Sequence, residues 1–70
     1  MSKVGLVLDF LEDGRWHEVK ELKQSLNLND DELQEIIGFL SNYELAEFDG
    51  KKEMVRINRD FQKLRDLNAA

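Results

Sequence analysis

The stretch LQEIIGFLSNYELAEFDGKKEMVRI, residues 33–57, contains the change of periodicity that decides the fold. In its first half, apolar residues recur at the spacing i, i+3, i+4, i+7, which is typical of one face of an α-helix. These residues are Leu33, Ile36, Ile37 and Leu40. After Tyr43 the period becomes two on both sides of Asp49-Gly50, and this pattern predicts a β-hairpin. We therefore expect a helix over about 30–42 and then two strands. The residues expected on one face of the hairpin are Ala46, Phe48, Val55 and Ile57.

Two more helices are expected before this stretch. Ser2 can cap the start of the first, and Gly14 can end it in the left-handed conformation that glycine adopts easily. The apolar residues of this helix are Val4, Val7, Leu8 and Leu11, with Leu6 and Phe10 widening the stripe. The second helix is expected over about 18–25, with an apolar face of Val19, Leu22 and Leu26. Trp16 precedes it, either as a hydrophobic staple or in a short strand.

The segment Asn27-Leu28-Asn29 predicts a tight turn between the second and third helices. Asn27 tolerates the left-handed region, and Leu28 between two asparagines is expected to plug the turn with an apolar side chain. Asn29 and Glu32 have the spacing of a capping box. The acids of the first turn, which the helix dipole favours there, are Asp30, Asp31 and Glu32.

Length and composition predict one globular domain, residues 1–70. The chain has 41% hydrophobic and 36% charged residues, and no cysteine that could form a disulfide or bind zinc. No apolar run approaches the roughly 20 residues of a membrane helix, and the N-terminus lacks the features of a signal peptide. We therefore expect a cytoplasmic protein with no membrane partner. A final short helix is expected from about Asp60, with Phe61, Leu64 and Leu67 facing inward.

With these elements the chain resembles the winged helix-turn-helix family, in particular its small archaeal and bacterial members. The likeness covers residues 3–67. It is carried by Gly14–Leu22, Leu28, Leu33–Leu40, Tyr43–Glu47 and Asp49–Lys52. In that family a core leucine leads from the third helix into the first wing strand, and Leu45 matches it. The resemblance implies an α+β, mostly α fold: a three-helix core, a two-stranded β wing and a short C-terminal helix.

Two features depart from the family pattern. His17 occupies the position where such domains usually carry a Ser or Thr cap for the second helix. The predicted third helix has no positive charge.

The resemblance implies binding of duplex DNA by a transcriptional regulator, with the third helix in the major groove and the wing on the backbone or minor groove. The candidate phosphate contacts are Lys51, Lys52, Arg56, Arg59, Arg15, Lys20 and Lys23. The candidate contacts to base edges are Gln34, Ser41 and Asn42. For any single lysine, an ordinary solvated side chain is the competing interpretation.

The distribution of charge gives an alternative function. Residues 1–48 carry a net charge of −7 and residues 49–70 a net charge of +2. The outward positions of the third helix carry carboxylates and no cation, so the helix would meet repulsion in a DNA groove. This favours DNA contact led by the wing, or else a protein-interaction module that binds a basic partner.

A homodimer is a further possibility if Phe39, Tyr43 and Met54 exceed what one small core can cover and leave an apolar patch. The competing expectation, which we favour, is that these three residues complete the core.

No catalytic or cofactor site can be assembled from the sequence. His17 is the only histidine, and no glycine-rich phosphate loop or Ser/His/Asp set is present. Trp16 is expected to pack rather than to stack on bases. We expect no enzyme activity, no metal, no cofactor and no small-molecule substrate.

Overall fold

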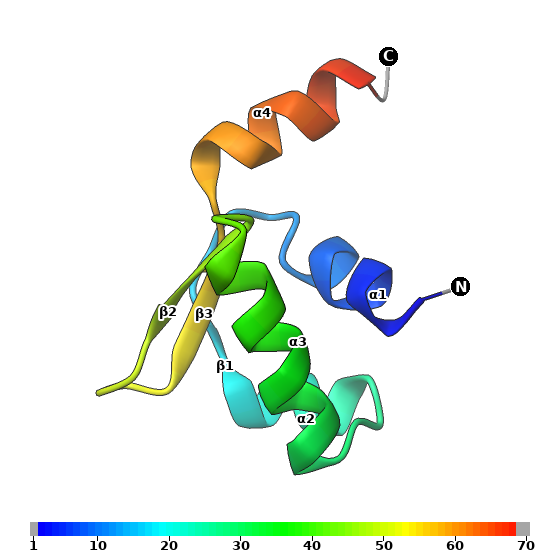
Figure 1. Cartoon of the computed structure of the whole chain (residues 1–70), viewed down its shortest axis with the longest axis vertical. Helices are drawn as coiled ribbons and strands as arrows, with labels where there is room; N and C mark the ends of the chain where they lie inside the picture. The colour runs from blue at the N-terminus through cyan, green and yellow to red at the C-terminus, as the bar shows by residue number, and fades with distance from the viewer. Residues whose placement is uncertain (1, 69–70) are drawn as a thin grey trace.

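The structure, a computed structural model, describes residues 2–68 and shows an α+β fold with four helices and three strands in that range (Figure 1). The elements are α1 (Lys3–Phe10), β1 (His17–Glu18), α2 (Val19–Ser25), α3 (Asp30–Asn42), β2 (Ala46–Asp49), β3 (Met54–Ile57) and α4 (Arg59–Asn68). The mostly helical α+β class is confirmed, and the arrangement is compatible with a winged helix. No helix within residues 2–68 is long and apolar enough to cross a bilayer.

The sheet has three strands in the described range, where a two-stranded wing was expected. The strand order is β1-β3-β2, and both pairings are antiparallel. The third strand is β1, two residues directly before α2, and its His17 lies opposite Val55. Trp16 is the residue directly before this strand and is not part of it. Two residues are too few to show the alternation of apolar and polar side chains that predicts a strand. The strand can be recognised only from its pairing with β3.

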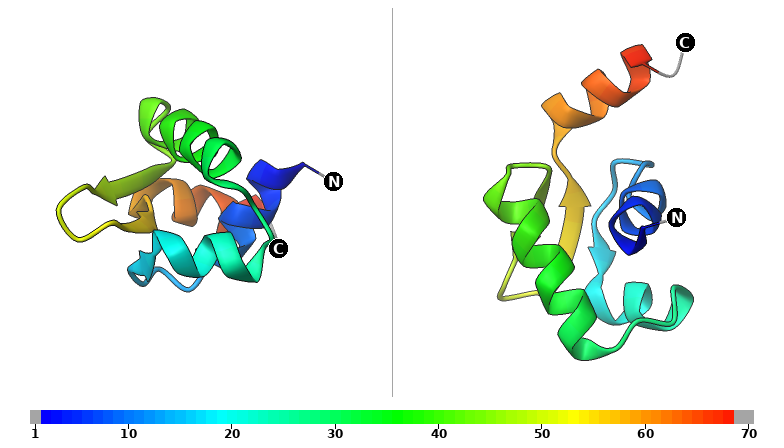
Figure 2. Two further views of the ribbon diagram at one scale, coloured as in Figure 1. Left: turned by 90° about the horizontal axis from the view of Figure 1, so that it is seen from below. Right: turned by 45° about the vertical axis from the view of Figure 1, so that its right-hand side comes forward.

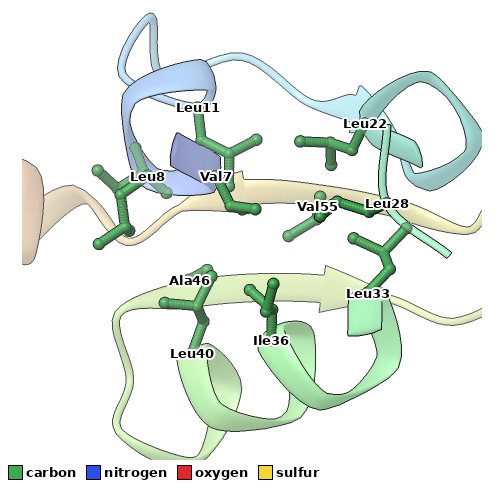
Figure 3. Close-up of a cluster of buried hydrophobic side chains, with 11 residues drawn as sticks. Val7, Leu8, Leu11, Leu22, Leu28, Leu33, Ile36, Leu40, Ala46 and Val55 are labelled. Carbon is green, nitrogen blue, oxygen red and sulfur yellow. The ribbon is translucent and has the colours of Figure 1, made fainter. Parts of the chain in front are cut away.

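The core lies between α1 and α2 on one side and α3 on the other, with the inner face of the sheet closing it (Figure 3). The buried residues are Val7, Leu8, Leu11, Leu22, Leu28, Leu33, Ile36, Leu40, Ala46, Val55 and Ile57. Leu28 is buried in the turn between α2 and α3, as expected. Phe48 is an exception on the hairpin face, since its side chain is 46% exposed. It lies on the edge strand next to the hairpin loop, whereas Val55 opposite lies in the central strand.

Local capping follows the sequence at three of the expected positions. The Ser2 hydroxyl accepts a hydrogen bond from the Gly5 N–H at 3.2 Å. Asn29 and Glu32 form the capping box, with bonds of 2.8 and 3.2 Å. Asn27 adopts a left-handed φ of 53°.

The ends of α1 and α2 differ from expectation by a few residues. Gly14 is left-handed with φ of 78°, but α1 ends at Phe10 and a turn fills the interval. The N-cap of α2 is Glu18 and not His17, which lies in β1; Glu18 makes no side-chain cap, and the helix begins at Val19. The backbone of residues 17–18 pairs with β3 instead of entering the helix.

The inward orientation expected for Leu64 and Leu67 is wrong. Phe61 packs against the core, but Leu64 is 58% and Leu67 74% exposed. The reason is that α4 extends away from α3 and the hairpin (Figures 1 and 2). Polar contacts hold it there: Gln62 Nε2 donates to the Glu12 carbonyl at 2.6 Å, and Arg65 Nη2 lies 2.8 Å from Asp9 Oδ1.

These positions predict two different responses to truncation of a leucine. Leu40→Ala removes a fully buried side chain at the centre of the core and is expected to lower the free energy of unfolding by about 2–5 kcal/mol. Leu67→Ala, the matched control on α4, is expected to change it by less than about 0.5 kcal/mol. Urea denaturation of both variants in dilute solution, where contacts within one chain decide the stability, measures the difference. An equal loss of unfolding free energy in the two variants would contradict the exposed position of Leu67 on α4.

Candidate interaction surface on α3 and the hairpin

One face of the molecule is built from a segment without cations. Residues 30–50 contain seven acidic residues and no lysine, arginine or histidine. They form α3 and β2, which pack against each other. This segment therefore concentrates negative charge on two adjacent elements.

Three of these carboxylates are neutralised by cations from other elements. Glu32 pairs with Lys3, Asp30 Oδ1 lies 2.8 Å from Lys23 Nζ, and Glu47 Oε2 lies 2.6 Å from Arg56 Nε. Asp31, Glu35 and Glu44 are exposed and form no ion pair within residues 2–68. Negative charge without a paired cation therefore remains on α3 and on the turn between α3 and β2.

A groove lies between α3 and the hairpin, with a volume of ≈ 300 Å³. Its lining residues are Val19, Gln34, Ile37, Gly38, Ser41, Phe48 and Glu53. Val19, Ile37 and Phe48 give it an apolar interior, and Glu53 is its only charged residue. Its size and lining suit one large apolar side chain and do not suit a phosphate.

Gly38 opens the groove at the middle of α3. A Cβ atom placed there would meet nothing within 4 Å, and its φ is not left-handed. Neither crowding nor backbone conformation therefore requires glycine at this position. A glycine inside a helix destabilises it by roughly 0.5–1 kcal/mol relative to alanine.

The candidate phosphate contacts do not form one positive surface. Lys51 and Lys52 are exposed in the hairpin loop, which projects beyond the helices (Figure 2). Lys20 and Lys52 line one small cleft together with Glu18 and Glu53, so its charges balance. Lys23 is paired with Asp30 on α3. Arg15 is exposed in the turn before β1.

Arg56 and Arg59 lie on the other side of the hairpin from the groove, in a polar cleft with Asp13 and Glu47. The Arg56 guanidinium sits 4.5 Å above the ring of Trp16 while it pairs with Glu47. Trp16 therefore packs, as expected, but against a cation at the surface rather than in the core. This use of Arg56 leaves its charge neutralised.

The candidate base-reading residues separate into two places. Gln34 and Ser41 line the groove, and Asn42 is exposed at the end of α3. The structure thus brings two of the three to the apolar groove beside Phe48.

The expectation that Phe39, Tyr43 and Met54 complete the core is wrong for the two aromatic residues. Phe39 is 44% and Tyr43 67% exposed, and their ring centroids lie 4.8 Å apart. Met54 is half-buried in β3. Phe39 and Tyr43 lie at one edge of the buried stripe of α3, Tyr43 at the C-cap, and their rings contact each other.

His17 joins the turn after α1 to α2. Its Nε2 lies 2.9 Å from Asp13 Oδ1 and its Nδ1 lies 3.0 Å from Glu21 Oε1, and its ring packs edge-on against Phe10. Carboxylates only accept hydrogen bonds, so both ring nitrogens must donate, which requires the charged imidazolium. Burial opposes this charge, but the hydrogen bonds to Asp13 and Glu21 outweigh it and raise the pKa of His17 above its ordinary value of 6.5.

The raised pKa predicts how stability depends on pH. The stabilisation from His17 is fully present below the pKa of the unfolded chain, about 6.5, and is lost as the pH rises through the higher folded pKa. Urea denaturation from pH 5 to 9 is expected to show falling stability over that window in the wild type and a flatter profile in His17→Gln. Stability that is constant or rises there in the wild type would contradict the paired imidazolium. An NMR titration of the ring measures the folded pKa directly.

The pKa of Asp13 moves the other way, because it accepts a backbone hydrogen bond from Arg15 and a side-chain bond from His17. Both hold it below its ordinary value of 3.8. Its contribution to stability is therefore present above that value and is lost as the pH falls through the folded pKa.

Sequence reasoning located the acidic helix but not the groove. The groove is formed by Gly38 and Phe48, which are ten residues apart in the sequence. Neither residue, seen within its own helix or strand, indicates that a groove lies between them. The one signal in the sequence was the glycine in the middle of a predicted helix. Comparison of this chain with models of protein families, with curated proteins and with solved structures gave no match.

Proposed function

We propose that the chain is a winged-helix protein-interaction domain that binds a basic segment of another protein at the groove between α3 and the hairpin. The order of elements supports the winged-helix part: α2, a tight turn, α3 and then the hairpin follow one another. The observation that carries the interaction part is the groove itself. It is apolar, its only charge is the carboxylate of Glu53, and it lies beside a cation-free acidic segment.

The charges of this surface indicate the chemistry of the partner. Asp31 and Glu35 on α3 repel a phosphate backbone and attract lysine or arginine side chains. The groove takes an apolar anchor, which supplies most of the affinity in a typical small interface. A partner segment with one bulky apolar residue flanked by cations fits both features.

Gly38 supports the same proposal. Access to the groove accounts for a glycine that the fold does not require. A side chain longer than that of alanine at this position would occupy the groove. It would also stabilise the helix relative to glycine.

Two substitutions at Gly38 separate stability from binding. Gly38→Ala is expected to raise the free energy of unfolding by about 0.5–1 kcal/mol because alanine is the better helix former. Gly38→Gln is expected to raise it by a similar amount and to fill the groove. Thermal or urea denaturation of both variants checks this part. A loss of stability in either variant would show that Gly38 is a structural requirement.

The binding test is a selection of random-sequence peptides displayed on phage against the wild-type chain. Enriched peptides are expected to carry lysine or arginine beside a bulky apolar residue. They should bind Gly38→Ala with little change and Gly38→Gln at least about tenfold more weakly, as loss of an anchor site predicts. The proposal fails if nothing is enriched, if the peptides are acidic, or if Gly38→Gln binds them as well as the wild type.

Wing-led DNA binding is the second candidate, because Lys51 and Lys52 are exposed at the projecting hairpin loop. The test is fluorescence anisotropy with a labelled duplex at about 50 mM salt, where phosphate contacts are strong. We expect no binding. Binding whose salt dependence drops by about one unit of slope in Lys51→Gln or Lys52→Gln would establish the DNA function instead.

A further inference from the structure

Strand β2 is an edge strand of the sheet, and it also borders the groove. The strand order β1-β3-β2 leaves one side of β2 without a neighbouring strand within residues 2–68 (Figure 1). Phe48, inside β2, contributes its side chain to the groove and is 46% exposed. The free edge of the sheet and the groove therefore meet at this residue.

The register of the hairpin identifies the backbone groups that have no partner at this edge. Asn58 lies opposite Leu45, and its N–H donates to the Leu45 carbonyl at 2.9 Å. Opposite residues in an antiparallel pair alternate between bonded and non-bonded positions. Glu47 therefore bonds to Arg56, and Phe48 directs its N–H and C=O away from β3. No backbone group of another segment within residues 2–68 bonds to these two groups.

The free backbone groups and the groove together select an extended segment as the ligand. An unpaired N–H and C=O on an edge strand match the backbone of another strand. Residues directly opposite on neighbouring strands point their side chains to the same face of the sheet. The residue opposite Phe48 therefore directs its side chain to the face on which Phe48 lines the groove.

The size of the groove separates a bound strand from a bound helix. A volume of ≈ 300 Å³ holds one large side chain. A helix that docks into a groove uses several apolar anchors, at i, i+3, i+4 and i+7, and needs a longer apolar surface. A strand obtains much of its affinity from backbone hydrogen bonds and needs only one anchor here.

We infer that the partner segment binds as an added strand along the free edge of β2, with its anchor residue opposite Phe48 and the side chain of that residue in the groove. This inference rests on the proposed function and specifies its binding mode. The added strand extends the sheet to the order β1-β3-β2-partner. Gly38, which has no side chain, leaves room for the anchor on the α3 side of the groove.

The experiment uses the tightest-binding peptide from the phage selection, synthesised with a single N-methyl group at each backbone position in turn. In an added strand, successive N–H groups alternate between facing β2 and facing solvent. Methylation of an N–H that faces β2 is expected to weaken binding about tenfold, because a carbonyl of β2 loses its donor. Methylation of the intervening positions is expected to weaken it less than about twofold. Fluorescence anisotropy with the whole chain measures each affinity.

Hydrogen exchange followed by NMR tests the same contact from the side of the protein. The Phe48 amide is expected to exchange at least about tenfold more slowly when the unmethylated peptide is bound, because it gains an acceptor. The Glu47 amide, which already bonds to β3 in the free chain, is the internal control and is expected to slow less.

The outcomes separate the binding mode from the proposed function. An alternating pattern together with slowed exchange at Phe48 supports the added strand. If the peptides bind and Gly38→Gln weakens them, but methylation is tolerated everywhere or is harmful at several consecutive positions, the strand inference is overturned and the proposed function stands. A Phe48 amide that is already protected in the free chain at about 100 µM and loses this protection on dilution shows that a second copy covers the edge, which also overturns it. If no peptide is enriched, both fail.

Discussion

The packing of the apolar stripe of α3 against the inner face of the hairpin positions the exposed faces of α3 and the groove beside it. Leu40 and Ile36 on α3 lie over Ala46 and Val55 of the sheet, with α1 and α2 completing the enclosure (Figure 3). Because one side of α3 is fixed in this way, its other positions are fixed in direction too. Gly38 faces the hairpin, and Phe39 with Tyr43 faces elsewhere. One buried stripe thus determines two separate exposed faces.

Much of this arrangement could be predicted from the sequence because the decisive signals are local. The stripe Leu33 to Leu40, the capping box at Asn29 and the left-handed Asn27 each depend on a few neighbouring residues. The hairpin follows from alternation around Asp49-Gly50. These features need no knowledge of what lies across the core.

The features that sequence reasoning missed depend on distant partners. A short strand before α2 was expected only as one of two alternatives for Trp16. The strand β1 forms at residues 17–18 because they pair with β3, and these two residues carry no pattern of their own. Leu64 and Leu67 have helical spacing, but nothing in that spacing says whether a second layer is present to cover them. Phe39 and Tyr43 were expected to complete the core, but both are exposed. A chain of 70 residues has a small core, and the buried core residues among residues 2–68 are all aliphatic. The candidate site is of the same kind, since its groove needs α3 and the hairpin together.

The position of β2 at the edge of the sheet has a consequence for solubility at high concentration. An edge strand that carries an exposed phenylalanine can pair with strands of other copies, and repeated pairing of this kind produces fibrous aggregates. Here the strand has only four residues, and Glu47 and Asp49 flank Phe48 within it. Glu47 is paired with Arg56, so stacking copies through this edge would bring the Asp49 carboxylates together at each added strand. The short length of β2 and the charge of Asp49 therefore disfavour amyloid-type assembly through this edge.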